Sequence, residues 1–491
     1  MMVSFEKMFG RLIIASNRLP VTVTDKNNQL TVNRSTGGVA TALDAIFKNR
    51  DTKWVGWMGL RRLLSDAELK GLRMPAGLVP INLSTQEVRR YYDRTANGTL
   101  YPSFLHYVPG DPCDEADWQA MIDVNRRFAE KIKFMARPND IIWVHDYHLL
   151  LLPYYLRQTG VTNRIGFFLH TPFPDVPYLK LLPYARHIVE SLAEADLIGF
   201  QTQRDVARFR KAHRTLLPKR TMRGSAQHFP IGVDYEQYHD AHKMPLVVQH
   251  AKEARQEVGN KQVLFSISRL DYVKGIVTQL RAVEKFLAGQ PASTRKHFVY
   301  KLVVAPSRED LEEYRRHKQE IERTVNRINK RLGTKTWGPI IYTYRSFGFE
   351  ELSAWYQLAD VVLVASRVDG MNLIAKEYIA ARQDDRGMLV LSNSIGVAVQ
   401  LNKAVLVDAA DVADIASGLR RAFAMPMSER RERWASMRRS VKEENIFWWA
   451  NCFIQALLSP QAAPKLPPRL SVTAEAPAKV TARRGGETQL L

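Results

Sequence analysis

Short apolar runs alternate with longer amphipathic segments along most of the chain. Apolar runs of about four to eight residues between turn residues are typical of buried strands, and longer segments with helical spacing are typical of helices. These runs predict strands over 11–16, 54–58, 78–83, 140–145, 164–169 and 197–201, and a second series over 262–267, 298–305, 340–344, 360–365, 388–392 and 404–407. Regular alternation of this kind predicts an α/β fold in which helices cover both faces of parallel sheets.

The two series of strands, in a chain of 491 residues, indicate two domains. The stretch 229–238 separates them, because its proline and glycine interrupt the pattern before the second series begins. We therefore expect doubly wound, Rossmann-like domains over 1–236 and 237–440 that face each other across a cleft. The aromatic segment 441–459 is expected to form a C-terminal helix that packs back on the first domain. The segment 460–491 is rich in Pro, Ala and charge, so we expect it to be disordered.

Cysteine usage and hydropathy indicate the compartment. Cys113 and Cys452 lie far apart and neither belongs to a CxxC motif, which argues against a disulfide framework and against structural zinc. No apolar run approaches the roughly 20 residues that span a bilayer. Lys7 and Arg11 lead directly into a strand-like run, so we expect no signal peptide. A cytoplasmic protein without a membrane partner is the expectation.

The formal net charge of +21 can indicate nucleic acid, an anionic membrane or small anionic ligands. Much of the excess lies in the helix-like stretches 210–223 and 428–442. No helix-turn-helix, zinc-finger or aromatic RNA-binding signature accompanies them. We therefore interpret these stretches as solvated helix faces and do not expect nucleic-acid binding as the main role, while an anionic activator stays open.

Charged residues follow the predicted strands in four motifs: SNRLP from Ser16, HDYH at 145–148, SRLDYVKG at 268–275 and DGMNLIAKE at 369–377. Ligand contacts of α/β sheets lie at the carboxyl ends of the strands. Cations suit phosphates there, and carboxylates suit sugar hydroxyls. The motifs predict an enzyme that handles two phosphorylated or sugar-like ligands.

In the first half, Arg18 can bind a phosphate bidentately, although a surface ion pair is the alternative. The turn that contains Gly38 offers backbone N–H groups to a diphosphate, and a plain loop is equally compatible with it. Asp146 and His170 follow two strands and suit hydrogen bonds to sugar hydroxyls or to a leaving group. The HxxH pattern at 145–148 lacks a third ligand at a fixed offset, so we do not expect a metal.

In the second half, Arg269 and Lys274 place two cations five residues apart after a strand, which suits a diphosphate whose charge grows as it leaves. Arg308 is a second candidate for a sugar phosphate. Asp369 precedes a predicted helix whose N-terminus favours phosphate. Glu377, about two helical turns further on, can accept hydrogen bonds from a ribose diol.

Together these motifs resemble one family, the trehalose-6-phosphate synthases, which are retaining glycosyltransferases with the GT-B fold. The similarity covers about residues 11–457 and is carried, in this order, by SNRLP, WVGWMG, YYDRTANGTLYP, VHDYHLLLLP, RIGFFLHTPFP, LIGFQT, FPIGVD, RLDYVKG, APSRED and DGMNLIAKEY. The resemblance implies transfer of glucose from a nucleotide sugar, most often UDP-glucose, to glucose 6-phosphate, which gives α,α-trehalose 6-phosphate. It implies trehalose biosynthesis and stress protection, without a metal or cofactor. We expect a homo-oligomer, a dimer or a tetramer.

The resemblance also implies roles for single residues. The acceptor ligands are Arg18, Trp57, Tyr92, Tyr101, Asp146 and Arg308. The donor ligands are Gly38, His170, Arg269, Lys274, Asp369, Gly370, Met371, Asn372, Leu373 and Glu377. The catalytic set is Asp146, His170, Arg269, Lys274 and Asp369. The pattern supplies no clear nucleophilic carboxylate, so we expect a front-face substitution in which Arg269 and Lys274 stabilise the leaving diphosphate.

The chain departs from the family pattern at a few places. Tyr101 stands where the family usually has Trp, and Val368 replaces the usual Arg before Asp-Gly-Met-Asn, with Arg367 one place earlier. The segments 394–401 and 408–411 also differ, which leaves the donor less certain than the reaction class. Two alternatives therefore stay open. One is a related transferase with another acceptor or donor, such as a glucosylglycerol-phosphate synthase or a pseudo-glycosyltransferase, and the other is a non-catalytic sugar-nucleotide-binding protein.

Overall fold

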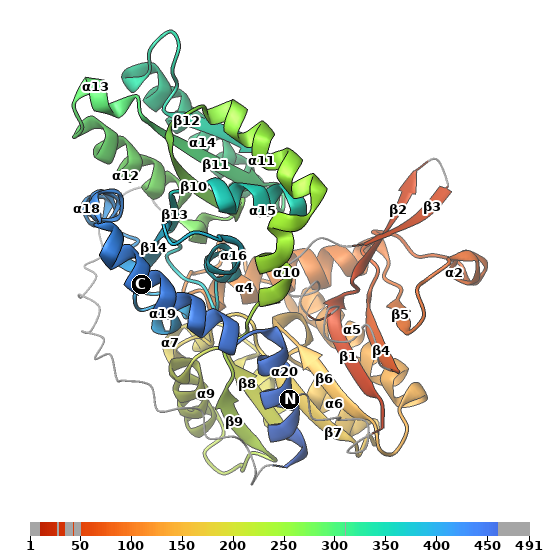
Figure 1. Ribbon diagram of the computed structural model, residues 1–491. Helices are drawn as coiled ribbons and strands as arrows, with labels where there is room; N and C mark the ends of the chain where they lie inside the picture. The colour runs from red at the N-terminus through yellow and green to blue at the C-terminus, as the bar shows by residue number, and fades with distance from the viewer. Residues whose placement is uncertain (1–9, 27–28, 35–42, 44–50, 310, 460–491) are drawn as a thin grey trace. The chain divides into compact units, whose positions relative to one another are not determined.

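Two separate parallel β-sheets organise the chain, one in each of two units. The computed structural model describes residues 10–26, 29–34, 43, 51–309 and 311–459 (Figure 1). The first unit comprises the chain up to Pro230 together with the chain from Trp449 onward, and the second comprises Ile231–Trp448. Each unit has its own sheet and its own helices, so the prediction of two Rossmann-like domains is confirmed.

The sheet of the first unit has seven strands in the order β5-β4-β1-β6-β7-β8-β9, all parallel. Strand order reverses at β1, which pairs with β4 on one side and β6 on the other: Leu12 lies opposite Thr52 and Ile141. A doubly wound sheet binds its ligands at this reversal, beyond the carboxyl ends of the strands.

The strands of this unit are β1 (Leu12–Arg18), β4 (Thr52–Trp57), β5 (Leu78–Ile81), β6 (Ile141–His145), β7 (Arg164–Phe168), β8 (Leu197–Phe200) and β9 (Ser225–His228), with an antiparallel hairpin of β2 (Val21–Lys26) and β3 (Gln29–Arg34). Its helices are α2 (Asp66–Gly71), α3 (Thr85–Glu87), η2 (Val88–Leu100), α4 (Tyr101–Phe104), α5 (Glu115–Met135), η3 (Tyr147–Leu149), α6 (Leu152–Gln158), α7 (Val176–Lys180), α8 (Ala185–Leu192) and α9 (Gln203–Leu216).

Helix α20 (Ile446–Leu458) begins in the second unit and from Trp449 onward belongs to the first, where it packs on the sheet (Figure 1). Strand glycines make room for it: a Cβ at Gly166 or at Gly199 would lie 2.7 Å from the ring of Phe453. That ring stacks on Trp143 of β6 with centroids 4.6 Å apart. Glycine inside a strand often marks such a close approach, and here it seats the C-terminal helix.

The sheet of the second unit has six parallel strands in the order β12-β11-β10-β13-β14-β15. Numbered from β10, this is the 3-2-1-4-5-6 order of a dinucleotide-binding fold. The reversal lies between β10 and β13, where Leu264 pairs with Val361. The carboxyl ends of these two strands are therefore the expected ligand position in this unit.

The strands here are β10 (Gln262–Arg269), β11 (Phe298–Ala305), β12 (Ile340–Tyr344), β13 (Val361–Val364), β14 (Met388–Ser392) and β15 (Val405–Val407). The helices are α10 (Tyr235–Asp240), η4 (Ala241–Lys243), α11 (Pro245–Val258), η5 (Tyr272–Lys274), α12 (Ile276–Ala288), α13 (Ala292–Arg295), α14 (Glu312–Leu332), α15 (Phe349–Leu358), α16 (Leu373–Ala381), α17 (Val397–Gln400), α18 (Val412–Ala424) and α19 (Met427–Glu443).

Alternate residues of β10 face opposite sides of this sheet, as the period of a strand requires. Leu264 belongs to a core cluster with Leu280 of α12 and Leu419 of α18. Phe265, the next residue, stacks on Trp355 of α15 with centroids 5.8 Å apart. Helices therefore cover both faces, and the ligand contacts have to come from the strand ends.

All twelve predicted strands are present within a few residues of the expected bounds. The hairpin β2–β3 and the edge strand β9 were missed. The hairpin alternates polar and apolar residues, and β9 has the sequence SAQH, so neither forms a continuous apolar run. A strand without a continuous apolar run gives no signal of the kind that predicts the other strands.

The chain returns from the second unit to the first at Trp449, in a region where one helix was expected over 441–459 and two are found. Helix α19 ends at Glu443, and α20 starts at Ile446 after a break. The side chain of Asn445 accepts hydrogen bonds from the backbone N–H groups of Phe447 and Trp448 at 3.0 Å, which starts a new helix. The first crossing lies at Pro230, six residues before the expected 236.

No helix among the described residues is both long enough and apolar enough to cross a membrane. The predicted disordered tail, 460–491, lies outside the described residues.

Candidate active site

In the first unit, four neighbouring strands end in predicted site residues. Trp57 ends β4, Arg18 ends β1, Asp146 follows β6, and His170 lies two residues beyond β7. Because β4, β1, β6 and β7 are adjacent in the sheet, the four residues share one edge. This edge includes the reversal of strand order between β1 and β6.

Arg18 is held by neutral groups. Its guanidinium carbon lies 4.9 Å from the ring centroid of Trp57, and its Nη2 donates to the hydroxyl of Thr22 at 3.0 Å. Among the described residues, no carboxylate forms an ion pair with Arg18. Burial lowers the pKa of this guanidinium from its ordinary value, since water is largely removed from the charge. A cation held this way is ready for an incoming anion.

Gly59 makes this position of Arg18 possible. It adopts φ +89°, and a Cβ there would lie 2.2 Å from Nη2 of Arg18. Glycine alone combines that backbone conformation with the absence of a side chain. The second glycine of WVGWMG is thus a seat for the guanidinium.

A row of rings continues from Trp57 to Tyr101. Trp57 meets Tyr92 edge-on at 5.2 Å, and Tyr92 stacks on His148 at 5.7 Å between centroids. His148 stacks on Tyr147 at 4.0 Å, and Tyr147 lies 5.6 Å from Tyr101. The row therefore joins three of the predicted acceptor residues and begins at the cation Arg18.

Tyr92 lies in η2, a π-helical segment of 13 residues. Its own polar side chains bond to carbonyls five residues earlier: Asn97 donates to Tyr92 at 2.9 Å, and Thr95 and Thr99 donate to Arg90 and Arg94. π-helical turns are rare and often occur at functional sites. The sequence YYDRTANGT builds the wide turn that carries Tyr92.

Asp146 has a strained backbone, with φ 71° and ψ 170°. This region is essentially restricted to glycine, and a non-glycine residue there costs about 1–3 kcal/mol. The surroundings enforce it: the Asp146 N–H donates to Phe168 at 2.8 Å, and its carboxylate accepts from the His170 N–H at 3.2 Å. Strain of this kind is a pointer to function.

His170 is paired with His145, since Nδ1 of His145 lies 3.2 Å from Nε2 of His170. Burial lowers the pKa of His170 to about 3 and holds that of His145 well below its ordinary value. Both imidazoles are therefore neutral near pH 7. His148, the other histidine of the HxxH pattern, instead stacks between Tyr92 and Tyr147. Over the described ranges, no cluster of three or more His, Cys, Asp or Glu could hold a metal.

In the second unit, Lys274 and Asp369 form a partly buried ion pair. The Lys274 Nζ lies 2.7 Å from Oδ2 of Asp369, Asn372 donates to the same oxygen at 2.9 Å, and the Gly370 N–H donates to Oδ1 at 3.1 Å. Burial on its own raises the pKa of Asp369, but Lys274, Asn372 and Arg269 outweigh it and the pKa is lowered. The carboxylate is therefore ionised, and the pair is neutral overall.

The same loop starts α16. Asn372 caps the helix by accepting from the Ala375 N–H at 3.3 Å, and Leu373 is the first helical residue. Gly370 and Met371 are buried in the turn before it. The helix N-terminus adds positive potential beside Lys274. Cation and helix end together suit a diphosphate.

Glu377 lies one turn into α16 and is 6% exposed. It accepts a hydrogen bond from the Tyr356 hydroxyl at 2.7 Å, and the Tyr238 hydroxyl also favours its ionised form. Burial raises the pKa of Glu377, and the two phenols lower it in part. The carboxylate is thus oriented by two side chains from other helices.

Arg308 belongs to the second unit, whereas the other predicted acceptor ligands belong to the first. It follows β11 with φ 51°, its Nη1 donates to the Tyr314 hydroxyl at 2.6 Å, and it lies 3.8 Å from Asp271. Arg269 at the end of β10 also lowers the pKa that burial raises at Tyr314. Among the described residues, the only non-glycine positions with positive φ are His106, Asp146 and Arg308, and two of these three are predicted site residues.

The departures from the family pattern flank the loop that carries Asp369. The Arg367 N–H donates to Val273 at 2.8 Å, and the Ser394 hydroxyl donates to the Arg367 carbonyl at 2.7 Å. The backbone N–H of Gly396 lies 3.4 Å from the Asp369 carbonyl. Segment 408–411 ends at Asp411, which caps α18. Gly38 lies outside the described residues.

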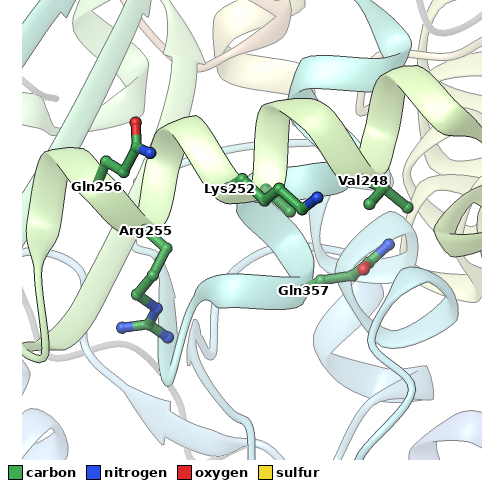
Figure 2. A pocket seen from close by; sticks show the side chains of 6 residues that line it. Val248, Lys252, Arg255, Gln256 and Gln357 are labelled. Atoms are coloured by element: carbon green, nitrogen blue, oxygen red, sulfur yellow. The ribbon is translucent and has the colours of Figure 1, made fainter.

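A separate hollow of about 550 Å³ lies between α11 and α15 in the second unit (Figure 2). It is lined by Val248, Ala251, Lys252, Arg255, Gln256 and Gln357. None of the predicted site residues lines it, and its two cations are exposed. The candidate chemistry therefore lies at the strand ends, not in this hollow.

Several residues of these sites were missed from the sequence: Gly59, His145, Tyr147, His148 as a ring partner, Tyr238 and Tyr356. Four of them lie inside the motifs WVGWMG and VHDYHLLLLP, next to predicted site residues, and that proximity could have identified them: Gly59, His145, Tyr147 and His148. Tyr238 is 139 positions from its partner Glu377, and no local pattern connects them.

Comparison with known proteins places the whole described chain in one group. The family model of glycosyltransferase family 20 matches residues 10–459. A bifunctional trehalose-6-phosphate synthase/phosphatase of Thermoproteus tenax is 36% identical over 473 residues, which cover 92% of this chain and 64% of that protein. The chain thus spans less than two thirds of the length of that relative.

Two solved structures resemble the fold over almost their full length. One, of E. coli trehalose-6-phosphate bound with UDP-2-fluoro glucose, has a TM-score of 0.81 and 31% identity, covering 92% of this chain and 99% of that chain. The other is an α,α-trehalose-phosphate synthase (UDP-forming) from Burkholderia xenovorans in complex with glucose-6-phosphate. It has a TM-score of 0.81 and 31% identity, covering 91% of this chain and 100% of that chain.

Proposed function

The chain belongs to glycosyltransferase family 20, and from this premise we propose that it transfers glucose from UDP-glucose to glucose 6-phosphate to give α,α-trehalose 6-phosphate. One observation carries the proposal: each unit places a cation and a carboxylate at the reversal of its strand order. In the first unit these are Arg18 and Asp146, and in the second they are Arg269 and Asp369. Two phosphate-and-hydroxyl sites in one chain suit a reaction between two phosphorylated sugars.

For the acceptor, we assign the phosphate to Arg18, Tyr92 and Arg308. Guanidinium groups bind phosphate bidentately, and a phenol donates to it. Asp146 accepts hydrogen bonds from acceptor hydroxyls, and Trp57 and Tyr101 lie near that pocket. The relative solved with glucose-6-phosphate supports this acceptor.

For the donor, we assign the diphosphate to Arg269 and Lys274, with backbone N–H groups of Gly38 and of residues 370–373. Asp369 and His170 contact the transferred glucose, and Glu377 the ribose. The structure bound with UDP-2-fluoro glucose supports a uridine nucleotide. Arg269 and Lys274 are two fixed cations, so they can supply the charge stabilisation without a metal.

The reaction we propose is a front-face substitution with retention. The bond from C1 of glucose to the diphosphate oxygen breaks, and a bond from C1 to the acceptor hydroxyl oxygen forms on the same face. The hydroxyl proton passes to the departing diphosphate oxygen. Retaining glycosidases instead use two carboxyl groups about 5–5.5 Å apart, one of them a nucleophile. Arg269 and Lys274 act by stabilising charge that grows on the leaving group.

The test is an assay of purified protein with glucose 6-phosphate and UDP-, GDP- or ADP-glucose. We expect release of UDP and a product whose single glycosidic bond joins two anomeric carbons that are both α by NMR. If none of the three donors releases its nucleoside diphosphate, the proposal fails. Turnover restored only by glycerol 3-phosphate would identify a related transferase. Cytoplasmic location, homo-oligomerisation and stress protection stay predictions from the sequence.

A further inference from the structure

The carboxylate of Glu377 is held from two directions inside the second unit. Tyr356 of α15 donates to Oε2 at 2.7 Å, and the hydroxyl of Tyr238 of α10 also stabilises the ionised carboxylate. Tyr356 is fully buried, and Glu377 is 6% exposed. Because α10 and α15 both pack on α16, the two phenols approach along different helices.

An ionised carboxylate has about four acceptor positions on its two oxygens. Tyr356 occupies one of them, and Tyr238 lies beside the same carboxylate. Two of the remaining positions match the two hydroxyls of a vicinal diol, such as the 2′ and 3′ hydroxyls of a ribose. A carboxylate free to rotate would lose entropy on binding such a diol, whereas one already fixed by two phenols loses little.

We propose that Tyr356 and Tyr238 are positioning residues that fix the Glu377 carboxylate for bidentate recognition of a ribose diol, so that they set the preference for ribonucleotide over 2′-deoxyribonucleotide donors. The inference rests on the proposed function, which assigns the ribose to Glu377. The inference adds the two tyrosines that make the contact between Glu377 and the ribose selective. Neither tyrosine has to touch the substrate.

The charge on Glu377 depends on the same phenols. Burial raises its pKa, and the Tyr356 and Tyr238 hydroxyls oppose that effect. On its own helix Lys376 donates to the Ile231 carbonyl, and from α19 the ring of Trp434 packs against Tyr378. Removing one phenol therefore raises the pKa of Glu377 further. Since only the ionised form accepts from both hydroxyls, affinity for the ribonucleotide is then lost at a higher pH.

Tyr378 offers a matched control on the same helix. It is fully buried, and its hydroxyl donates to the Ala359 carbonyl at 3.0 Å. Tyr378→Phe removes a buried phenol bond next to Glu377 without touching the carboxylate. A general loosening of α16 would affect this variant as much as Tyr356→Phe.

The experiment measures binding of UDP and of 2′-deoxy-UDP by calorimetry, for the full chain and its variants, between pH 5 and 8. We expect the wild type to prefer UDP by about 10-fold to 100-fold, the range for a hydrogen bond to a charged group. Tyr356→Phe and Tyr238→Phe should each reduce this preference by at least about 3-fold and move the acid loss of UDP affinity to higher pH. Tyr378→Phe should change neither.

The outcomes separate the two claims. If UDP does not bind the wild type, or if Glu377→Gln leaves the UDP preference intact, the assignment of ribose to Glu377 in the proposed function is wrong. If Glu377→Gln abolishes the preference but both phenylalanine variants keep it, the positioning role is wrong. Two tyrosines are tested so that poor folding of one variant still leaves a decisive result from the other.

Discussion

The two strand-end sites hold their cations in opposite ways. Arg18 lies on the Trp57 ring and bonds to the Thr22 hydroxyl, with no carboxylate partner among the described residues. Lys274 lies 2.7 Å from the Asp369 carboxylate. Among the described residues, the charge of Arg18 is therefore not balanced by a carboxylate, whereas the charge of Lys274 is balanced by Asp369.

This difference predicts different roles in the reaction. An anion that reaches Arg18 gains its attraction at once, so Arg18 should stabilise the bound acceptor in ground and transition state alike. An anion at Lys274 competes with Asp369 and gains most when its own charge increases, as on a departing diphosphate. Interactions that strengthen in the transition state raise kcat, whereas uniform binding lowers KM. The predicted difference is tested by measuring whether a variant at each position changes kcat or KM.

Lys274→Ala gives the largest expected effect. Loss of a preorganised charge at a developing oxyanion lowers kcat by about 10²–10³-fold, with a smaller change in the KM for UDP-glucose. Steady-state kinetics with varied donor measures both. Lys285→Ala, an exposed lysine on α12, is the control and should behave as wild type. A raised KM for UDP-glucose with unchanged kcat would contradict the prediction, because Lys274 would then stabilise the bound donor and the transition state equally.

Arg18→Gln should act mainly on the acceptor KM. Loss of a hydrogen bond to a charged group is worth about 1.5–3 kcal/mol, or about 10-fold to 150-fold in kcat/KM for glucose 6-phosphate. The slow reaction with unphosphorylated glucose should change little, because it lacks the phosphate.

Arg61→Gln is the control for Arg18, since the Arg61 guanidinium is already paired with Asp93 at 2.7 and 2.9 Å and is half-exposed. It should change acceptor kinetics by less than about 3-fold, as expected for an exposed ion pair. Equal losses in Arg18→Gln and Arg61→Gln would show that general surface charge, and not the seat on Trp57, attracts the acceptor.

Gly59→Ala tests the seat itself. The new Cβ would lie 2.2 Å from Nη2 of Arg18, so the guanidinium has to move from the Trp57 ring. We expect a rise in the acceptor KM of about 10-fold, the cost of a lost cation–π contact and a displaced charge. Alanine at φ +89° also destabilises the fold.

Gly71→Ala is the matched substitution for Gly59, because a Cβ there meets nothing within 4 Å. It should leave kinetics unchanged and keep or raise the melting temperature. If Gly59→Ala destabilises the protein but leaves the acceptor KM unchanged, Arg18 does not need its present position.

The sequence predicted the strands, the family and the edges of the sheets at which the charged residues lie. Local patterns are sufficient for this, because a buried strand is a continuous apolar run and its carboxyl end is the next residue. Membership of the trehalose-6-phosphate synthase family and the GT-B fold are confirmed by the family model and the solved relatives.

Long-range partners could not be predicted in this way. Lys274 meets Asp369 across 95 positions, His145 meets His170 across 25, and Tyr238 meets Glu377 across 139. Each pair comes together because adjacent strands or packed helices bring distant segments side by side, which no local pattern records. The polar edge strand β9 escaped for a related reason, since pairing alone makes it a strand.

The smallest expected effect is on the pH dependence of stability, which differs between the titrating groups of the two units. His145 and His170 are neutral in the folded protein, and the pKa of His170 is lowered to about 3, below the ordinary value near 6.5. Below about pH 6.5 the unfolded state binds protons that the folded state does not, so stability falls on acidification by up to about 1.4 kcal/mol per pH unit for each imidazole. Asp369 has a lowered pKa, so the stability from its ionisation is lost only at more acidic pH.

His145→Phe keeps the ring against Trp449 and Phe168 but removes one titrating group. Urea unfolding followed by tryptophan fluorescence at pH 7.5 and 5.5 should show a smaller acid loss for the variant than for the wild type, by about 1 kcal/mol. Lys133→Gln, a substitution at an exposed position of α5 in the same unit, should keep the wild-type loss. An acid loss that is equal in His145→Phe and the wild type would mean that folding does not lower the pKa of this imidazole. At acidic pH the first sheet would then carry a second positive charge, on His145 of the strand next to Arg18.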